Sequence, residues 1–120
     1  TLFILISTTC YAADISQVTK DLEQAETLQI AVNAAETSDY KAMTPVLTKE
    51  YNDKIINGEG ADKFMKGAYK DWFRDGRRFK KIEAIKKSEN SIDLRIDMND
   101  GALKTLEFKL VNGKWLISKI

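Results

Sequence analysis

The dipeptide Asn112-Gly113, between two runs of alternating polar and apolar residues, most constrains how this chain can fold. A two-residue type I′ turn needs positive φ at both central positions, and Asn followed by Gly is the strongest short signal for it. The chain end is therefore predicted to form a β hairpin with one apolar face. Its expected cross-strand pairs are Leu110 with Trp115 and Phe108 with Ile117, and Trp115 is expected to anchor the core.

Residues 77–98 show the same period of two and predict two further strands. Phe79, Ile82 and Ile85 are spaced by three in the first, which favours a β bulge. Residues 91–98 alternate strictly, with Ile92, Leu94, Ile96 and Met98 on one face. The next turn must be odd in length for the apolar faces to coincide. We expect three residues, ending at Gly101; a five-residue turn would instead pair Arg95 with Glu107.

Three helical segments precede the strands. Asp14 and Gln17 resemble a capping box that opens a long helix through residue 35, with an apolar stripe at Ile15, Val18, Leu22, Ala25, Leu28, Val32 and Ala35. Residues 40–57 form a weaker helical pattern, in which a helix ends near Thr44 or a new one begins at Pro45. A third helix is expected from the Asp62 cap to Gly76, with Phe64, Ala68 and Trp72 facing inward.

These elements predict an α+β fold: a long N-terminal helix and two further helical segments packed on a curved four-stranded antiparallel sheet. The 120 residues are enough for one domain, which we assign to residues 13–120.

The first twelve residues are expected to be a signal peptide, truncated at its start. An apolar run at residues 2–6 leads to Cys10 and Ala12, small residues that suit positions −3 and −1 of a cleavage site. The run is too short to span a bilayer. Export to the periplasm or the extracellular space follows, and the mature chain would then contain no cysteine. Two alternatives are a buried first strand and a lipoprotein anchored at Cys10.

Charge and composition limit the kinds of catalysis and ligand binding that this chain can support. The chain has no histidine, which removes the usual general base and the commonest metal ligand. Residues 14–62 hold ten acids and four bases, whereas residues 63–120 hold eight acids and fifteen bases. This asymmetry could steer an anionic partner to the second half, or draw an acidic helical layer to a basic sheet. No sequence pattern indicates a cofactor or a metal site.

The aromatic residues are the best candidates for a ligand pocket. Rings with a polar tip suit small-molecule sites, although aromatic residues at helical spacing are usually core. The candidate pocket residues are Tyr40, Tyr51, Tyr69, Trp72 and Phe73.

Two charged features were weighed as alternative sites. Asp71 and Asp75 could form a catalytic carboxylate pair, but the alternating bases Lys70, Arg74 and Arg77 favour an ion-paired, solvated face. A basic run with Phe79 interleaved could bind nucleic acid or an anionic polymer, although a solvated strand is the commoner meaning of such a run. Export argues against nucleic acid. The basic run comprises Arg74, Arg77, Arg78, Lys80, Lys81, Lys86 and Lys87.

Two motifs resemble a known superfamily. The segment Thr37-Ser38-Asp39-Tyr40-Lys41-Ala42 is similar to the "gDy.kA" joint of small secreted bacterial domains in the nuclear transport factor two-like superfamily, the cystatin-like α+β roll. The ending from Leu110 to Ile117 resembles that group's closing "lv..dGkWkI" hairpin. The resemblance implies a cone-shaped roll with a pocket. Enzymatic members use an Asp, His or Tyr in that cone, and this chain departs from the His-dependent pattern.

We therefore expect an exported, non-catalytic module that binds a small apolar ligand or a protein partner through its cone or sheet. No catalytic residue is assigned. The alternative is a small isomerase- or hydrolase-type enzyme that uses a buried Asp or Tyr. An open pocket with a carboxylate and no cation in reach would favour the enzyme. Any ligand site is expected between the third helix and the sheet, away from the basic run.

Overall fold

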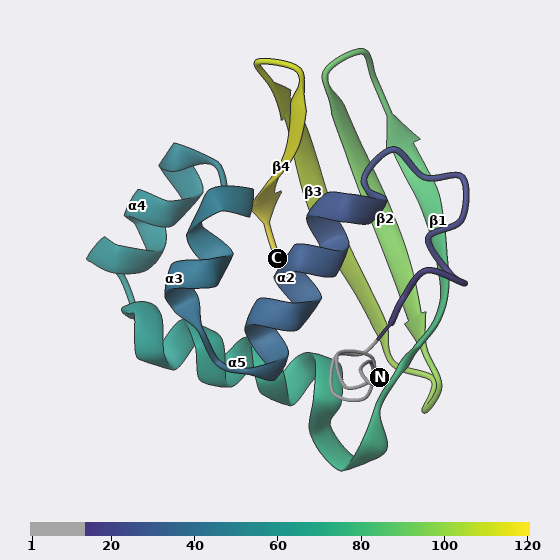
Figure 1. Cartoon of the computed structure of the whole chain (residues 1–120), viewed down its shortest axis with the longest axis horizontal. Helices are drawn as coiled ribbons and strands as arrows, with labels where there is room; N and C mark the ends of the chain where they lie inside the picture. The colour runs from purple at the N-terminus through teal and green to yellow at the C-terminus, as the bar shows by residue number, and fades with distance from the viewer. Residues whose placement is uncertain (1–13) are drawn as a thin grey trace, which may run out of the picture.

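The structure, a computed structural model, describes residues 14–120. The predicted signal peptide, its cleavage site after Ala12 and Cys10 lie outside the described residues. The described part contains four α helices on one side of a four-stranded antiparallel sheet of order β1-β2-β3-β4 (Figure 1), which confirms an α+β fold. The elements are α2 (Ala25–Glu36), α3 (Tyr40–Met43), α4 (Lys49–Asn57), α5 (Ala61–Phe73), β1 (Phe79–Lys87), β2 (Ser91–Met98), β3 (Leu103–Val111) and β4 (Lys114–Lys119).

The closing hairpin forms as the Asn-Gly signal predicts. Asn112 has φ 51° and Gly113 φ 80°, the positive values that a type I′ turn requires. Both predicted cross-strand pairs are present. Trp115, however, is only partly buried, whereas Trp72 is fully buried, so the expectation that Trp115 anchors the core is wrong.

The turn between β2 and β3 has the expected three residues. The amide of Met98 donates to the carbonyl oxygen of Ala102 at 2.8 Å, and Gly101 adopts φ 92°. This register pairs Arg95 with Thr105. β1 contains the predicted irregularity, with register shifts on both sides of Ile82. Ile82 is buried, but Ile85 is 47% exposed because the second shift turns it away from the core.

The long N-terminal helix is not formed. Its second half is α2, but residues 14–24 fold into successive turns. Short polar side chains there bond to the local backbone, which competes with helix formation: Asp14 Oδ1 accepts from the amide of Ser16 at 2.9 Å, and Thr19 Oγ1 donates to the carbonyl oxygen of Ile15 at 2.9 Å. Asp21 has φ 71°, which no right-handed helix allows. Ile15 is nevertheless buried, so the apolar stripe contacts the core without being helical.

The central helices follow their caps. Asp39 Oδ1 accepts from the amide of Ala42, and α3 ends before a 3-10 turn, Thr44–Val46, that contains Pro45. Thr48 then caps a separate helix, α4. The helix α5 begins one residue before Asp62 and ends at Phe73, ahead of a 3-10 turn, Arg74–Gly76.

The core lies between the helices and one face of the sheet. Its largest fully buried side chains come from α2, α3, α5 and all strands but β1: Trp72, Phe108, Leu28, Met43, Leu94, Ile96, Met98, Leu106, Ile117 and Val32. The segment after Val46 closes the edge beside β4, since the amide of Thr48 donates to the carbonyl oxygen of Ile117 at 2.9 Å. At the opposite edge, no strand among residues 14–120 pairs with the free side of β1.

Candidate ligand-binding site

Tyr40 and Tyr51 hold helices together. Each ring meets Phe64 of α5 edge to face, with centroids 6.1 and 6.0 Å apart. The Tyr40 hydroxyl donates to Oδ1 of Asn52, and the Tyr51 hydroxyl accepts from the amide of Ile120 at 3.1 Å. Burial raises the pKa of both phenols. These contacts dock α3 and α4 onto α5.

The three aromatic residues near the end of α5 have different surroundings. Trp72 is fully buried, and its ring meets Phe79 of β1 edge to face at 5.8 Å. Tyr69 is 45% exposed and packs beside Phe73 at 5.6 Å. Phe73 is partly buried and borders a cavity. The structure therefore does not bring the five predicted residues together. Tyr40 and Tyr51 pack between helices, and Trp72 is part of the core. Phe73 lines the cavity, and Tyr69 does not.

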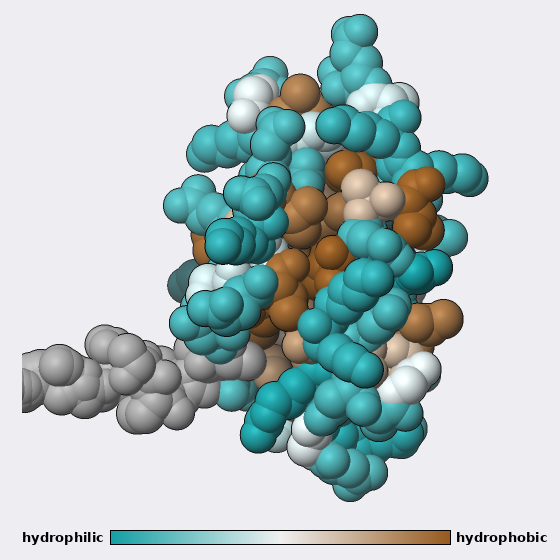
Figure 2. All heavy atoms as spheres, turned by 90° about the vertical axis from the view of Figure 1, so that its right-hand side faces the viewer, coloured by the Kyte–Doolittle hydropathy of each residue, from teal (hydrophilic) through white to brown (hydrophobic). Residues whose placement is uncertain are grey.

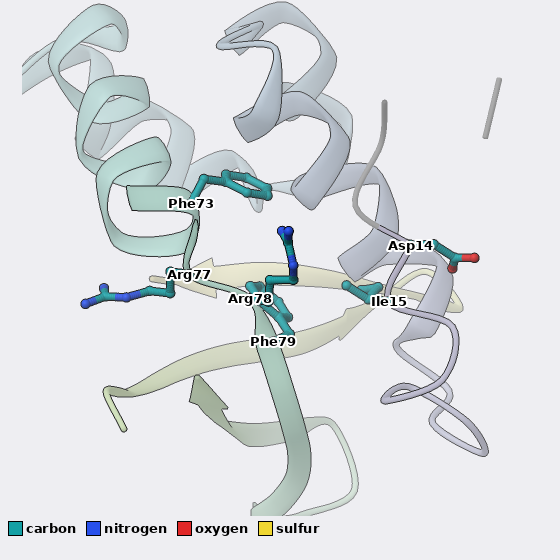
Figure 3. A pocket seen from close by; sticks show the side chains of 6 residues that line it. All are labelled: Asp14, Ile15, Phe73, Arg77, Arg78 and Phe79. Atoms are coloured by element: carbon teal, nitrogen blue, oxygen red, sulfur yellow. The ribbon is translucent and has the colours of Figure 1, made fainter. Parts of the chain in front are cut away.

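The cavity bordered by Phe73 has a volume of about 270 Å³ and lies where the end of α5, the start of β1 and the first turns meet (Figure 3). On the side of the molecule formed by β1 and the first turns, Figure 2 shows hydrophobic side chains in a hollow between hydrophilic ridges. The cavity lining combines three apolar and three charged residues: Ile15, Phe73, Phe79, Asp14, Arg77 and Arg78.

The side chain of Arg77 is held by contacts within the protein beside this cavity. Its Nε atom bonds to Oδ2 of Asp100 at 2.8 Å, and its Nη1 atom donates to the carbonyl oxygen of Asp71 at 2.8 Å. The amide of Ala102 and the Arg77 side chain both donate to Asp100 and lower the pKa of its carboxyl. Arg77 thus ties the end of α5 to the β2–β3 turn.

Asn99 holds the same loop from the other side. Its Oδ1 atom accepts from the amide of Arg78 at 2.8 Å, and its own amide donates to the carbonyl oxygen of Arg78 at 2.9 Å. Its Nδ2 atom donates to the carbonyl oxygen of Gly76 at 3.2 Å. The backbone at the cavity mouth is therefore held by three hydrogen bonds from one residue.

The side chain of Arg78 points into the cavity. Figure 3 shows its guanidinium directed toward the gap between Phe73 and Ile15, while Arg77 points away. Among residues 14–120 this guanidinium has no ion pair or hydrogen bond. The carboxylate of Asp14 also points away (Figure 3), and the Ser16 amide that donates to it lowers its pKa.

Three further cavities among residues 14–120, of about 490, 280 and 360 Å³, open beside α4, β4 and α2. Each contains at least one carboxylate, and each also contains a lysine: Lys54, Lys109 and Lys119 in the first, Lys114 in the second, and Lys54 and Lys119 in the third. None of the Asp or Glu side chains in residues 14–120 is buried. An isolated buried carboxyl, whose raised pKa would suit a general acid at neutral pH, is absent from this part of the chain.

The described residues contain neither a metal-ligand cluster nor a membrane-spanning helix. No group of three or more Cys, Asp or Glu residues within 14–120 is arranged to hold a metal ion. In the same range, no helix combines the length and apolar character needed to cross a membrane.

Comparison of the sequence with protein-family models and with curated proteins finds no match. The resemblance to the nuclear transport factor two-like superfamily therefore rests on the short motifs named above.

Sequence reasoning singled out Phe73 and the basic run but placed them in rival sites. The structure brings Phe73, Arg78 and Phe79 to one cavity. Ile15 was expected on a helix stripe, and Asn99 only in a turn, so neither was expected at this position. The interleaved Phe79 was the one available signal that the basic run borders an apolar surface.

Proposed function

We propose that this chain is an exported, non-catalytic binding module that holds a small apolar ligand in the cavity between the end of α5 and the start of β1. The observation that carries the proposal is the apolar wall of Phe73, Phe79 and Ile15 around about 270 Å³. Small-molecule sites are typically about 300–1,000 Å³ and mostly apolar, so a compact ligand suits this cavity. The α+β fold supports a nuclear transport factor two-like roll, with this cavity as the opening of its cone.

A protein partner on the sheet is the weaker alternative. The outer face of β1 and β2 carries ion pairs, one across the strands between Arg95 and Glu83 and one within β2 between Arg95 and Asp97. Charged surfaces of this kind stay hydrated, and charged residues are depleted from the centre of protein interfaces. The outer sheet face is thus better suited to solvent than to a protein.

The enzyme alternative needs a buried Asp or Tyr with a shifted pKa. The described carboxylates are not buried. Tyr51 is the more buried of the two packed tyrosines, but burial raises its pKa and keeps its hydroxyl protonated, which opposes a general-base role. These observations favour binding over catalysis.

Calorimetric titration with 1-octanol, a neutral apolar probe, tests the proposed function. We expect Phe73→Ala to weaken octanol binding about fivefold, because roughly 1 kcal/mol of apolar contact is lost. Tyr69→Ala is the matched control, since it removes a neighbouring exposed ring that does not line the cavity. An octanol affinity that is unchanged in Phe73→Ala, or that is abolished by changing Lys80 and Lys81 to Glu, would contradict the proposal.

A further inference from the structure

The two arginines of the cavity differ in what they can still bind. Arg77 has an 11%-exposed side chain and is held by Asp100 and by a carbonyl oxygen of α5. Arg78 uses only its backbone, which Asn99 holds in place. None of the N–H donors of its guanidinium is used by another described residue, so all of them can bind a ligand. One cation is structural, and the next one along the chain is free.

Arg78 is an exposed residue, and its guanidinium points toward the apolar gap between Phe73 and Ile15 (Figure 3). An anion bound there would displace water from the apolar surfaces of Phe73 and Ile15, and a less hydrated setting strengthens a charged hydrogen bond. Asp14, the one acid among the lining residues that the structure describes, points away from this space (Figure 3).

The charge distribution of the C-terminal half of the chain also favours a negatively charged ligand. Four of the six lining residues belong to residues 63–120, where fifteen bases exceed eight acids. The ion pairs Arg77–Asp100 and Lys104–Asp71 join groups within that half and leave its basic excess unchanged. A positive field at a concave surface concentrates anions near it.

We infer that the ligand of this cavity is a small amphiphile with an anionic head group, whose head is bound by the Arg78 guanidinium and whose apolar body contacts Phe73, Phe79 and Ile15. This inference rests on the proposed function of the cavity. The planar guanidinium fork suits a carboxylate or a phosphate oxygen pair. Arg78 is then the residue that determines ligand charge.

The test compares probes that share one apolar chain. Octanoate and octyl phosphate are titrated beside 1-octanol and octylammonium, with the protein in low salt. We expect at least one anion to bind about tenfold more tightly than octanol, the usual gain from a charged hydrogen bond at a partly exposed site. The tighter of the two anions identifies the head group. Octylammonium should bind more weakly than octanol.

Arg78→Gln should remove the advantage of the anion over octanol, measured as the ratio of the two affinities in the same variant. Arg74→Gln is the control, because it removes the same charge nearby from a residue that does not line the cavity.

An equal affinity of wild type for octanoate, octyl phosphate and octanol would overturn the inference while leaving the proposed function intact. Failure of every probe, octanol included, would overturn both. An anion advantage that persists in Arg78→Gln would place the head group elsewhere and contradict the inference.

Discussion

Trp72 and Trp115 have the same side chain but different surroundings. Trp72, on the inner face of α5, is fully buried and meets Phe79 edge to face. Trp115 shares the inward face of β4 with Ile117, yet one side of its ring borders the surface cavity near Pro45. A residue on the apolar face of a strand is therefore not always buried. It is buried only where a helix or loop covers that part of the sheet.

Truncation of each tryptophan should show this difference. We expect Trp72→Ala to lower the free energy of unfolding by about 3–5 kcal/mol, the usual loss for a buried large aromatic residue. Trp115→Ala should cost less than half as much, since its ring already contacts solvent. Urea unfolding followed by circular dichroism measures both. Equal losses, or a larger loss for Trp115→Ala, would contradict the described packing.

Arg78 shows why the site was harder to predict than the core. Its neighbours in the chain are basic, so the sequence pattern indicates a solvated surface. Its backbone is held at the cavity by Asn99, which is 21 residues away. No local pattern encodes such a contact, whereas Phe73 could be selected from its position on a helix alone.

At the scale of elements, the sheet could be predicted almost completely and the first helix only in part. Strand register follows from local chemistry, since Gly101 and Gly113 sit at positive φ where the turns require it. The apolar spacing of residues 14–24 matched a helix equally well, but side chains such as Asp14 and Thr19 bond to nearby backbone and favour turns. The apolar stripe predicted the core contacts of Ile15, Val18 and Leu22, but not the backbone conformation.

Two glycines offer a test of turn chemistry with opposite expected signs. A methyl group at either Gly113 or Gly67 would meet no atom within 4 Å, so only backbone conformation decides the outcome. Gly113→Ala should destabilise the protein by about 1–2 kcal/mol, because alanine is strained at φ 80°. Gly67→Ala, inside α5, should stabilise it by about 0.5–1 kcal/mol.

Thermal or urea unfolding of the two glycine variants gives the comparison directly. The same sign of change in both would show that backbone conformation is not the deciding factor. A neutral Gly113→Ala variant would contradict the type I′ geometry of the closing hairpin.

At the scale of the whole molecule, the described residues already form a closed core. Ile15, the second described residue, is buried, and its amide donates to Oε1 of Gln29 at 3.0 Å. The core cluster therefore extends from Ile15 to the buried Ile117 near the end of the chain. These contacts lie within the range 13–120 that we assign to the domain.

The export proposal predicts a mature N-terminus at Ala13. A signal peptidase accepts only small residues at positions −3 and −1, so Ala12→Tyr should block cleavage and leave the precursor uncut. Tyr11→Ala, at the tolerant position −2, is the control and should be processed like the wild type. N-terminal sequencing and mass spectrometry of protein from the extracytoplasmic fraction distinguish the outcomes. An uncut wild-type chain in the cytoplasm would refute export, whereas a lipid-modified N-terminal Cys10 would support the lipoprotein alternative and move the mature start three residues upstream of Ala13.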